Sequence, residues 1–268
     1  MNNTLSIIMP ALNEENNITD AVCNALKSMV KHNIEGEIIV VNDGSTDSTR
    51  RKVEELAVKN PAVKLINHDF PRGIGFSFWD GMKNSVKDVV VMFPGDNEND
   101  PDDAMEFYKL MDLVDIVVPF IHNAEMRDKK RRLISSLYRF ILNMSFGVSL
   151  NYTNGTVFYR RAVLHDIKLK SHGFFYQGEL LIRLIRKGYL FAEVPNYLMV
   201  RKGGKSKATT LKSLLAVIKD YLGLMFDIHI LRIEAREGYR RISSDSMTYL
   251  KKNDFDRKTK NLNRGSAR

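Results

Sequence analysis

Residues 37–47 read Glu37-Ile38-Ile39-Val40-Val41-Asn42-Asp43-Gly44-Ser45-Thr46-Asp47, an apolar run that ends in a polar turn. A run without alternating polar positions predicts a strand that is buried on both faces. The residues after the turn have the apolar spacing of a helix, with Val53 and Leu56 on one side. A buried strand, a turn and a helix in this order predict one unit of a parallel α/β sheet.

Four more apolar runs in the first 120 residues extend this pattern on both sides. The predicted strands are Leu5–Met9, Val63–Ile66, Asp88–Phe93 and Asp115–Pro119. Helical patterns separate the first four strands, and Pro10 is expected to end the first of them. Buried strands that alternate with helices predict an α/β fold with a Rossmann-like, mostly parallel sheet and helices on both faces.

The pattern changes after residue 120. The predicted elements are a basic helix over Arg131–Phe146, a strand over Thr156–Tyr159, a helix over Gln177–Lys187 and an extended segment over Tyr189–Val200. We therefore divide the chain into a sheet-forming domain (1–210), with a nucleotide-type half (1–120) and an acceptor-type half (121–210), a helical extension (211–250) and a basic tail (251–268). The tail is poor in apolar residues, and we expect it to be flexible.

The extension begins with an amphipathic helix from Leu211 to Ile233. Its polar residues form one narrow stripe and leave a wide apolar arc. Lys219, Asp220 and Asp227 make a membrane-spanning role unfavourable. Two outcomes stay open for the arc: it packs on the rest of the protein or on a second copy in a homo-oligomer, or it lies in a membrane interface.

The composition narrows the cellular setting. The sequence contains no run of 18 apolar residues, the length that would predict a membrane span. Residues 1–4 lack the basic and apolar regions of a signal peptide. The single cysteine, Cys23, cannot form an internal disulfide, which suits a reducing compartment. We expect a cytoplasmic protein that is soluble, or peripheral on the inner face of the cell membrane.

The formal net charge is +9, and basic residues gather at 127–132, at 201–207 and in the tail. Nucleic acid, anionic lipid and a phosphorylated substrate are all compatible with this charge. The basic runs have no interleaved aromatic residues, so we expect no nucleic-acid partner.

Polar or glycine-rich residues follow each of the first four predicted strands. They are Asn13-Glu14-Glu15, Asp43–Asp47, Arg72-Gly73-Ile74-Gly75 and Gly95-Asp96-Asn97-Glu98. Each alone is compatible with an ordinary turn or helix cap, but ligands bind at the carboxyl ends of parallel strands. The chain lacks a dinucleotide fingerprint and a P-loop. Acidic loops would repel a diphosphate unless a cation intervened, and Asp96 and Glu98 offer carboxylates to Mg²⁺ or Mn²⁺.

Four motifs stand in order along the chain: Pro10–Glu14, Val41–Asp47, Gly95–Glu98 and Arg201-Lys202-Gly203-Gly204-Lys205-Ser206-Lys207. Together they resemble the motifs of family 2 glycosyltransferases with a GT-A fold, and most nearly the polyprenyl (dolichol) phosphate sugar synthases. The resemblance covers roughly residues 4–210. It implies a metal-dependent, inverting transfer of a hexose from a UDP- or GDP-sugar to an acceptor, with polyprenyl phosphate as the expected acceptor.

The resemblance also implies roles for individual residues. The donor-binding residues would be Pro10, Leu12, Glu14, Asp43, Gly73, Gly75 and Asp96. The residues that bind the acceptor or its phosphate would be Arg127, Arg131, Arg132, Arg201, Ser206 and Lys207. The catalytic candidates are Asp96, Glu179 and Arg201, and the metal ligands would be Asp96 and Glu98.

Two departures from the family pattern matter. Pro94 replaces an aspartate of the metal motif, and we interpret Glu98, where a glutamine is usual, as compensating for it. Residues 151–155 read Asn-Tyr-Thr-Asn-Gly where that branch often has Asp-Pro-Thr-Ser-Gly. The alternatives are transfer to a glycan hydroxyl, with Glu179 as the base, a sugar-nucleotide pyrophosphorylase, and a non-catalytic nucleotide-sugar binding module.

Overall fold

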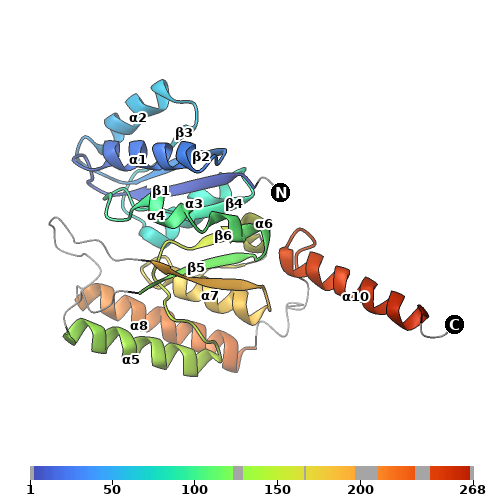
Figure 1. Ribbon diagram of the computed structural model, residues 1–268. Helices are drawn as coiled ribbons and strands as arrows, with labels where there is room; N and C mark the ends of the chain where they lie inside the picture. The colour runs from blue at the N-terminus through green and yellow to red at the C-terminus, as the bar shows by residue number, and fades with distance from the viewer. Residues whose placement is uncertain (1–2, 123–128, 166, 197–210, 233–241, 266–268) are drawn as a thin grey trace.

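The computed structural model describes residues 3–122, 129–165, 167–196, 211–232 and 242–265 of the 268-residue chain. Its centre is one sheet of seven strands in the order β3-β2-β1-β4-β6-β5-β7 (Figure 1). The strands are β1 (Leu5–Ala11), β2 (Gly36–Asp43), β3 (Val63–His68), β4 (Val89–Met92), β5 (Ile116–Ile121), β6 (Phe158–Arg160) and β7 (Phe191–Asn196).

All neighbouring strands are parallel except at β6, which is antiparallel to both β4 and β5. The predicted mostly parallel sheet is therefore confirmed. Pro10 does not end β1, which runs one residue further, to Ala11. A proline lacks only its own N–H, and its carbonyl still accepts a bond of 3.0 Å from the Gly95 N–H.

Helices cover both faces of the sheet. They are α1 (Ile18–Lys31), α2 (Thr49–Lys59), α3 (Ile74–Lys83), α4 (Pro101–Met105), α5 (Lys129–Phe146), α6 (Arg161–Leu164), α7 (Tyr176–Arg186), α8 (Leu211–Met225) and α10 (Met247–Gly265), with the short helices η1 (Tyr108–Asp112) and η4 (Phe226–Ile230). One core unites α1, α2 and α4 with Ile7 of β1, and the other unites α3, α5, α7 and α8 with Ile8. Successive strand residues thus enter opposite cores.

Residues 251–265 of the tail that we expected to be flexible are helical and belong to α10 (Figure 1). The buried Asp115 carboxylate accepts bonds from Met247 N at 2.6 Å and Thr248 N at 3.0 Å, which satisfies free N–H groups at the helix start. Lys258 and Asp254 pair one turn apart at 2.8 Å. The composition that indicated flexibility is also compatible with a solvated helix anchored at one end.

Most of the apolar arc of α8 is exposed, although Met225 packs on the core. Leu222 is 58% exposed and Phe226 is 51% exposed. Asp227, from the polar stripe, is buried instead. The helix therefore buries Asp227 together with Leu224 and Ile228, and it leaves most of its apolar arc exposed.

Candidate active site

The ends of β1, β2, β3 and β4 lie at one edge of the sheet. Register places Ala11 opposite Asn42, and Asp43 opposite His68. The segment after β4 continues along β1 through the bond from Gly95 N to the Pro10 carbonyl. The four loops that the sequence singled out are therefore neighbours, which is where ligands bind in such sheets.

Each of these four loops contains one residue with left-handed backbone geometry. They are Asn13 (φ 57°), Gly44 (φ 74°), Gly73 (φ 100°) and Asn97 (φ 57°). Glycine adopts this region at little cost, and asparagine tolerates it better than most residues. A Cβ at Gly44 would also lie 2.5 Å from the Phe70 carbonyl carbon. The chain therefore turns sharply at every strand end, with residue types that permit it.

Asp43 lies at the centre of a buried hydrogen-bonded group. Its carboxylate accepts bonds of 2.9 Å from both Arg72 N and Gly73 N. His68 Nδ1 lies 2.8 Å from Asp43, and His68 Nε2 lies 3.1 Å from the Asp80 carboxylate. These contacts fix the orientation of Asp43, the residue expected to bind the base or the ribose. Sequence reasoning missed His68 and Asp80, although His68 ends β3 in register with Asp43.

Hydrogen bonds join the loops after β1 and β2. Asn13 N donates to Ser45 Oγ at 2.9 Å, and Glu14 N donates to Thr49 Oγ1 at 2.8 Å. Burial tends to raise the pKa of Asp47, but hydrogen bonds from Thr49 and from the Glu15 N–H outweigh this and lower it. Asp47 thus stays ionised as the acceptor that holds the two loops together.

The residues expected to line the nucleoside pocket have different exposures. Pro10 is buried within β1, and Leu12 and Glu14 are half-buried in the loop that follows. The Glu14 carboxylate accepts a bond of 2.8 Å from Asn17 Nδ2. The three residues lie where the prediction puts them in the fold, and their contact with a nucleoside stays a prediction.

The candidate metal ligands follow β4. Asp96 is half-buried and Glu98 is exposed, and Glu98 N donates to Asp96 Oδ1 at 3.1 Å. Within the described residues, no group of three or more His, Cys, Asp or Glu side chains is placed to hold a metal. Mg²⁺ commonly takes only one or two protein carboxylates and completes its shell with substrate phosphates and water. Asp96 and Glu98 fit such a site.

Gly73 and Gly75 have a packing role in the structure. A Cβ at Gly73 would lie 2.6 Å from the His172 carbonyl oxygen, and a Cβ at Gly75 would lie 2.6 Å from Tyr176 Cβ. Gly75 N also donates to the His172 carbonyl at 2.9 Å. Both glycines thus let the start of α3 approach the segment before α7. Their expected approach to the donor stays a prediction.

Arg72, beside Asp43, is a cation at this edge that sequence reasoning did not assign. Its guanidinium carbon lies 3.4 Å from the centre of the Phe76 ring, within the range of a cation–π contact. The contact places a positive charge next to the loops expected to bind a diphosphate.

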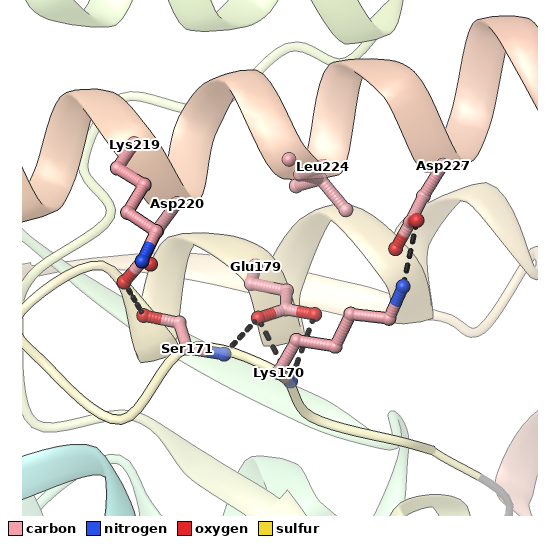
Figure 2. A pocket seen from close by; sticks show the side chains of 8 residues that line it. Lys170, Ser171, Glu179, Lys219, Asp220, Leu224 and Asp227 are labelled. Atoms are coloured by element: carbon pink, nitrogen blue, oxygen red, sulfur yellow. Dashed lines mark hydrogen bonds and ion pairs between the residues drawn. The ribbon is translucent and has the colours of Figure 1, made fainter.

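Glu179 lies in the first turn of α7, just after the segment that packs against Gly73 and Gly75. Its carboxylate accepts bonds from the backbone N–H groups of Lys170 and Ser171 and from Arg183 Nε at 2.8 Å. Arg183 also bonds Asp227 at 2.9 Å. Lys170, Ser171, Glu179 and Asp227 line a small cavity between α7 and α8, shown in Figure 2. Glu179 is 2% exposed and already accepts several bonds, an arrangement typical of a positioning residue.

The expected acceptor residues are only partly described. Arg131 and Arg132 belong to the first turn of α5, and Arg132 is exposed. Arg127, Arg201, Ser206 and Lys207 lie outside the described residues. The phosphate contacts expected of these six residues stay predictions.

Comparisons with known sequences place the chain in one family. A profile of glycosyl transferase family 2 matches residues 6–168, which is more than half of the chain. The chain belongs to glycosyl transferase family 2. It is therefore a glycosyltransferase of the hexosyltransferase type.

Two named glycosyltransferases match over most of the chain. The polyprenol monophosphomannose synthase of Mycolicibacterium smegmatis is 30% identical, and the match covers 75% of this chain and 79% of that protein. The undecaprenyl-phosphate mannosyltransferase of Micrococcus luteus is 27% identical, with 65% and 76% covered. Both enzymes are named for polyprenyl phosphates.

Solved structures of similar fold confirm the GT-A fold. Glucosyl-3-phosphoglycerate synthase from Mycobacterium tuberculosis, in complex with Mn²⁺, UDP-glucose and phosphoglyceric acid, superposes with a TM-score of 0.62 at 21% identity. The match covers 83% of this chain and 80% of that one. The same enzyme with Mg²⁺ and UDP gives a TM-score of 0.61, with 83% and 79% covered.

Proposed function

We propose that this family 2 glycosyltransferase moves a hexose from a UDP- or GDP-sugar to polyprenyl phosphate, with inversion at the anomeric carbon. The use of a nucleotide-sugar donor is supported by the convergence of the Asp43 and Asp96 loops at the carboxyl edge of the sheet. The acceptor half is supported by the similarity, over most of the chain, to two enzymes named for polyprenyl phosphates.

On the donor side, Asp43 is expected to bind the nucleoside in the orientation that His68 and the Gly73 N–H impose. Asp96 and Glu98 would hold Mg²⁺ or Mn²⁺ against the diphosphate. An ion bound there neutralises the negative charge that develops on the leaving nucleoside diphosphate. A glycosyltransferase of similar fold has been crystallised with each of these ions and UDP, which supports the assignment.

On the acceptor side, a lipid phosphate is already an anion at neutral pH. Its oxygen can attack the anomeric carbon without a strong general base, whereas a sugar hydroxyl needs a carboxylate to take its proton. Glu179, the only base we assigned, is buried and bonded to Arg183 and to two backbone N–H groups. This geometry favours the phosphate acceptor over the glycan hydroxyl.

A lipid acceptor also sets the place of reaction, which we propose to be the inner face of the cell membrane. Among the helices in the described part of the chain, none combines the length and apolar character needed to cross a bilayer. Contact with the lipid would then be peripheral.

A donor and acceptor screen tests this function. Release of UDP or GDP is measured from a panel of hexose nucleotides, with and without undecaprenyl phosphate, in Mg²⁺, in Mn²⁺ and in EDTA. We expect one donor to be consumed only when both the lipid phosphate and a divalent ion are present. Transfer to a glycan hydroxyl in preference to the lipid phosphate would contradict the proposed acceptor.

A further inference from the structure

We propose that α5 and α8, together with η4, form one surface that docks on an anionic lipid membrane. We call it the two-helix face. From α5 it comprises Leu133, Ile134, Leu137, Phe140, Ile141 and Met144. From α8 and η4 it comprises Leu214, Leu215, Ile218, Leu222, Phe226 and Ile230.

These side chains form an unusually large exposed apolar surface. Each of the twelve residues is between 44% and 72% exposed. Single exposed apolar residues are common on soluble proteins, but large contiguous patches mark sites of interaction. The two-helix face is therefore a surface that needs an apolar partner.

The two helices are packed directly against each other. The hydroxyl groups of Ser145 and Tyr221 are hydrogen-bonded, and the Phe146 and Tyr221 rings lie 5.6 Å apart between centroids. His229 Nε2 lies 2.7 Å from the Ser145 carbonyl oxygen. Figure 1 shows α5 and α8 side by side, at the side of the molecule opposite α1 and α2. Their exposed sides therefore adjoin.

Polar contacts fix α8 with its apolar side outward. Asp220 accepts a hydrogen bond from the Ser171 hydroxyl, as Figure 2 shows. Two turns further along, Asp227 binds Arg183 at 2.9 Å and Lys170 at 2.7 Å. Rotating the helix to bury its apolar arc would break these contacts and expose both acids. The exposure of the arc is thus built into the fold.

The charge of these helices matches an anionic lipid surface. The α5 sequence contains Lys129, Lys130, Arg131, Arg132 and Arg139, with no acidic residue. Of these, Arg132 and Arg139 are exposed, and Lys219 and Arg232 are exposed on or just after α8.

The acids of the described residues 211–232, Asp220 and Asp227, bond inward. An apolar face bordered by cations is typical of a helix that lies in a membrane interface. In a two-fold symmetric dimer the same face would bring like charges together, which disfavours a second copy as the occupant.

The chain segment between β5 and α5 limits how far this face can lie from the donor loops. Strand β5 is parallel to β1, so Ile121 lies at the same edge as the candidate active site, and α5 begins eight residues later. Eight residues of extended chain span at most about 29 Å. Docking would thus hold the basic start of α5 at the lipid headgroups beside the donor. This last step rests on the proposed function, whereas the docking itself does not.

Vesicle co-sedimentation of the full chain, without donor or acceptor, tests the docking. We expect binding to phosphatidylcholine vesicles that contain 30% phosphatidylglycerol, and at least tenfold weaker binding to pure phosphatidylcholine or in 0.5 M salt. Leu222→Asp with Phe226→Asp should weaken binding at least tenfold, and Leu137→Asp with Phe140→Asp should do the same from the other helix.

The matched control places aspartates at exposed apolar residues far from the face. Val58 is 88% exposed and Val86 is 63% exposed. Val58→Asp with Val86→Asp adds the same charge, and vesicle binding should change less than twofold. Circular dichroism and urea unfolding of each variant identify any that fail to fold.

Two results would overturn the proposal. One is a wild-type protein that ignores anionic vesicles at low salt. The other is a stable dimer, measured by light scattering, that the face variants dissociate, which would make the face a subunit contact. Binding that persists in an enzyme without lipid-phosphate transferase activity would refute the proposed acceptor alone.

Discussion

Replacing Arg183 by methionine tests the buried charged group between α7 and α8. Arg183 bonds Glu179 Oε1 at 2.8 Å and Asp227 Oδ2 at 2.9 Å, and its side chain is 8% exposed. Burial tends to lower the pKa of Arg183, but the two carboxylates outweigh it and raise the pKa, so the guanidinium stays charged. Methionine retains much of the volume and removes the charge.

The expected loss of stability follows from the groups left behind. Removing one partner of a buried ion pair costs about 3–5 kcal/mol, because the other charge stays buried without compensation. Here Glu179 keeps its two backbone donors and Asp227 keeps Lys170, which is partly exposed. We therefore expect the loss in unfolding free energy to lie at the lower end of this range, at about 3 kcal/mol. With a urea m-value near ~3 kcal/mol/M, the unfolding midpoint would fall by about 1 M.

A matched control is available on α2. Arg50 and Glu54 form the same kind of pair, one turn apart at 2.8 Å, but both side chains are about half exposed or more. Exposed pairs of this kind contribute about 0.5 kcal/mol or less. Urea unfolding of Arg50→Met should therefore give a nearly unchanged midpoint. If Arg183→Met moved the unfolding midpoint no further than this control does, the buried group of Arg183, Glu179 and Asp227 would not have the stabilising role that we assign to it.

The same experiment decides the role of Glu179. If Glu179 only positions α7 and α8, Glu179→Gln should lower stability and leave turnover of the folded enzyme within a few-fold of wild type. A double-mutant cycle with Arg183→Met should then show strong coupling in unfolding free energy. Loss of turnover without loss of stability would instead restore Glu179 as a catalytic base.

Three further predictions concern the sheet and its edge. Asp96→Ala should abolish transfer as EDTA does, and should weaken Mn²⁺ binding in the presence of UDP by at least tenfold in calorimetry; unchanged Mn²⁺ binding would remove Asp96 from the metal site. His68→Gln should raise the Kd for the nucleotide by about tenfold, because Asp43 loses its orientation, and an unaltered Kd would show that the backbone bonds suffice. Burial tends to raise the pKa of Glu37, but bonds from Lys64, Ser6 and the Val86 N–H outweigh burial and lower the pKa. The ionised Glu37 carboxylate therefore stabilises the fold fully above its unfolded-state pKa, and this stabilisation is lost as the pH falls through the lower folded-state pKa. Glu37→Gln should therefore unfold more easily at pH 7 and show a flatter loss of stability between pH 5 and 3, which urea midpoints across that range would measure.

Strands and their polar ends were predictable because both signals are local. A run such as residues 37–41 predicts a doubly buried strand, and Asn42 and Asp43 directly follow it. The contact between His68 and Asp80 was not predictable, because it depends on how α3 returns across β3. Nothing in the residues next to His68 indicates which carboxylate it meets.

The orientation of α8 and the helical tail show a second limit. Periodicity predicted an apolar arc but could not say which side of the helix faces the protein. That choice depends on Arg183 and Ser171, which lie about 40–50 residues away in sequence. Likewise the start of α10 is anchored by Asp115, more than 130 residues earlier. Partners so distant in sequence leave no local pattern.

Because α10 is anchored at Asp115, its position can be used to measure how the protein is oriented on a membrane. Asp115 precedes β5, so α10 starts at the edge of the sheet opposite the donor loops. At about 1.5 Å per residue, its 19 residues extend about 28 Å, and Figure 1 shows the helix projecting from the body. Phe255 on this helix is 70% exposed. A fluorophore at that position would report, by energy transfer to labelled lipid, the angle at which the sheet stands above a bilayer.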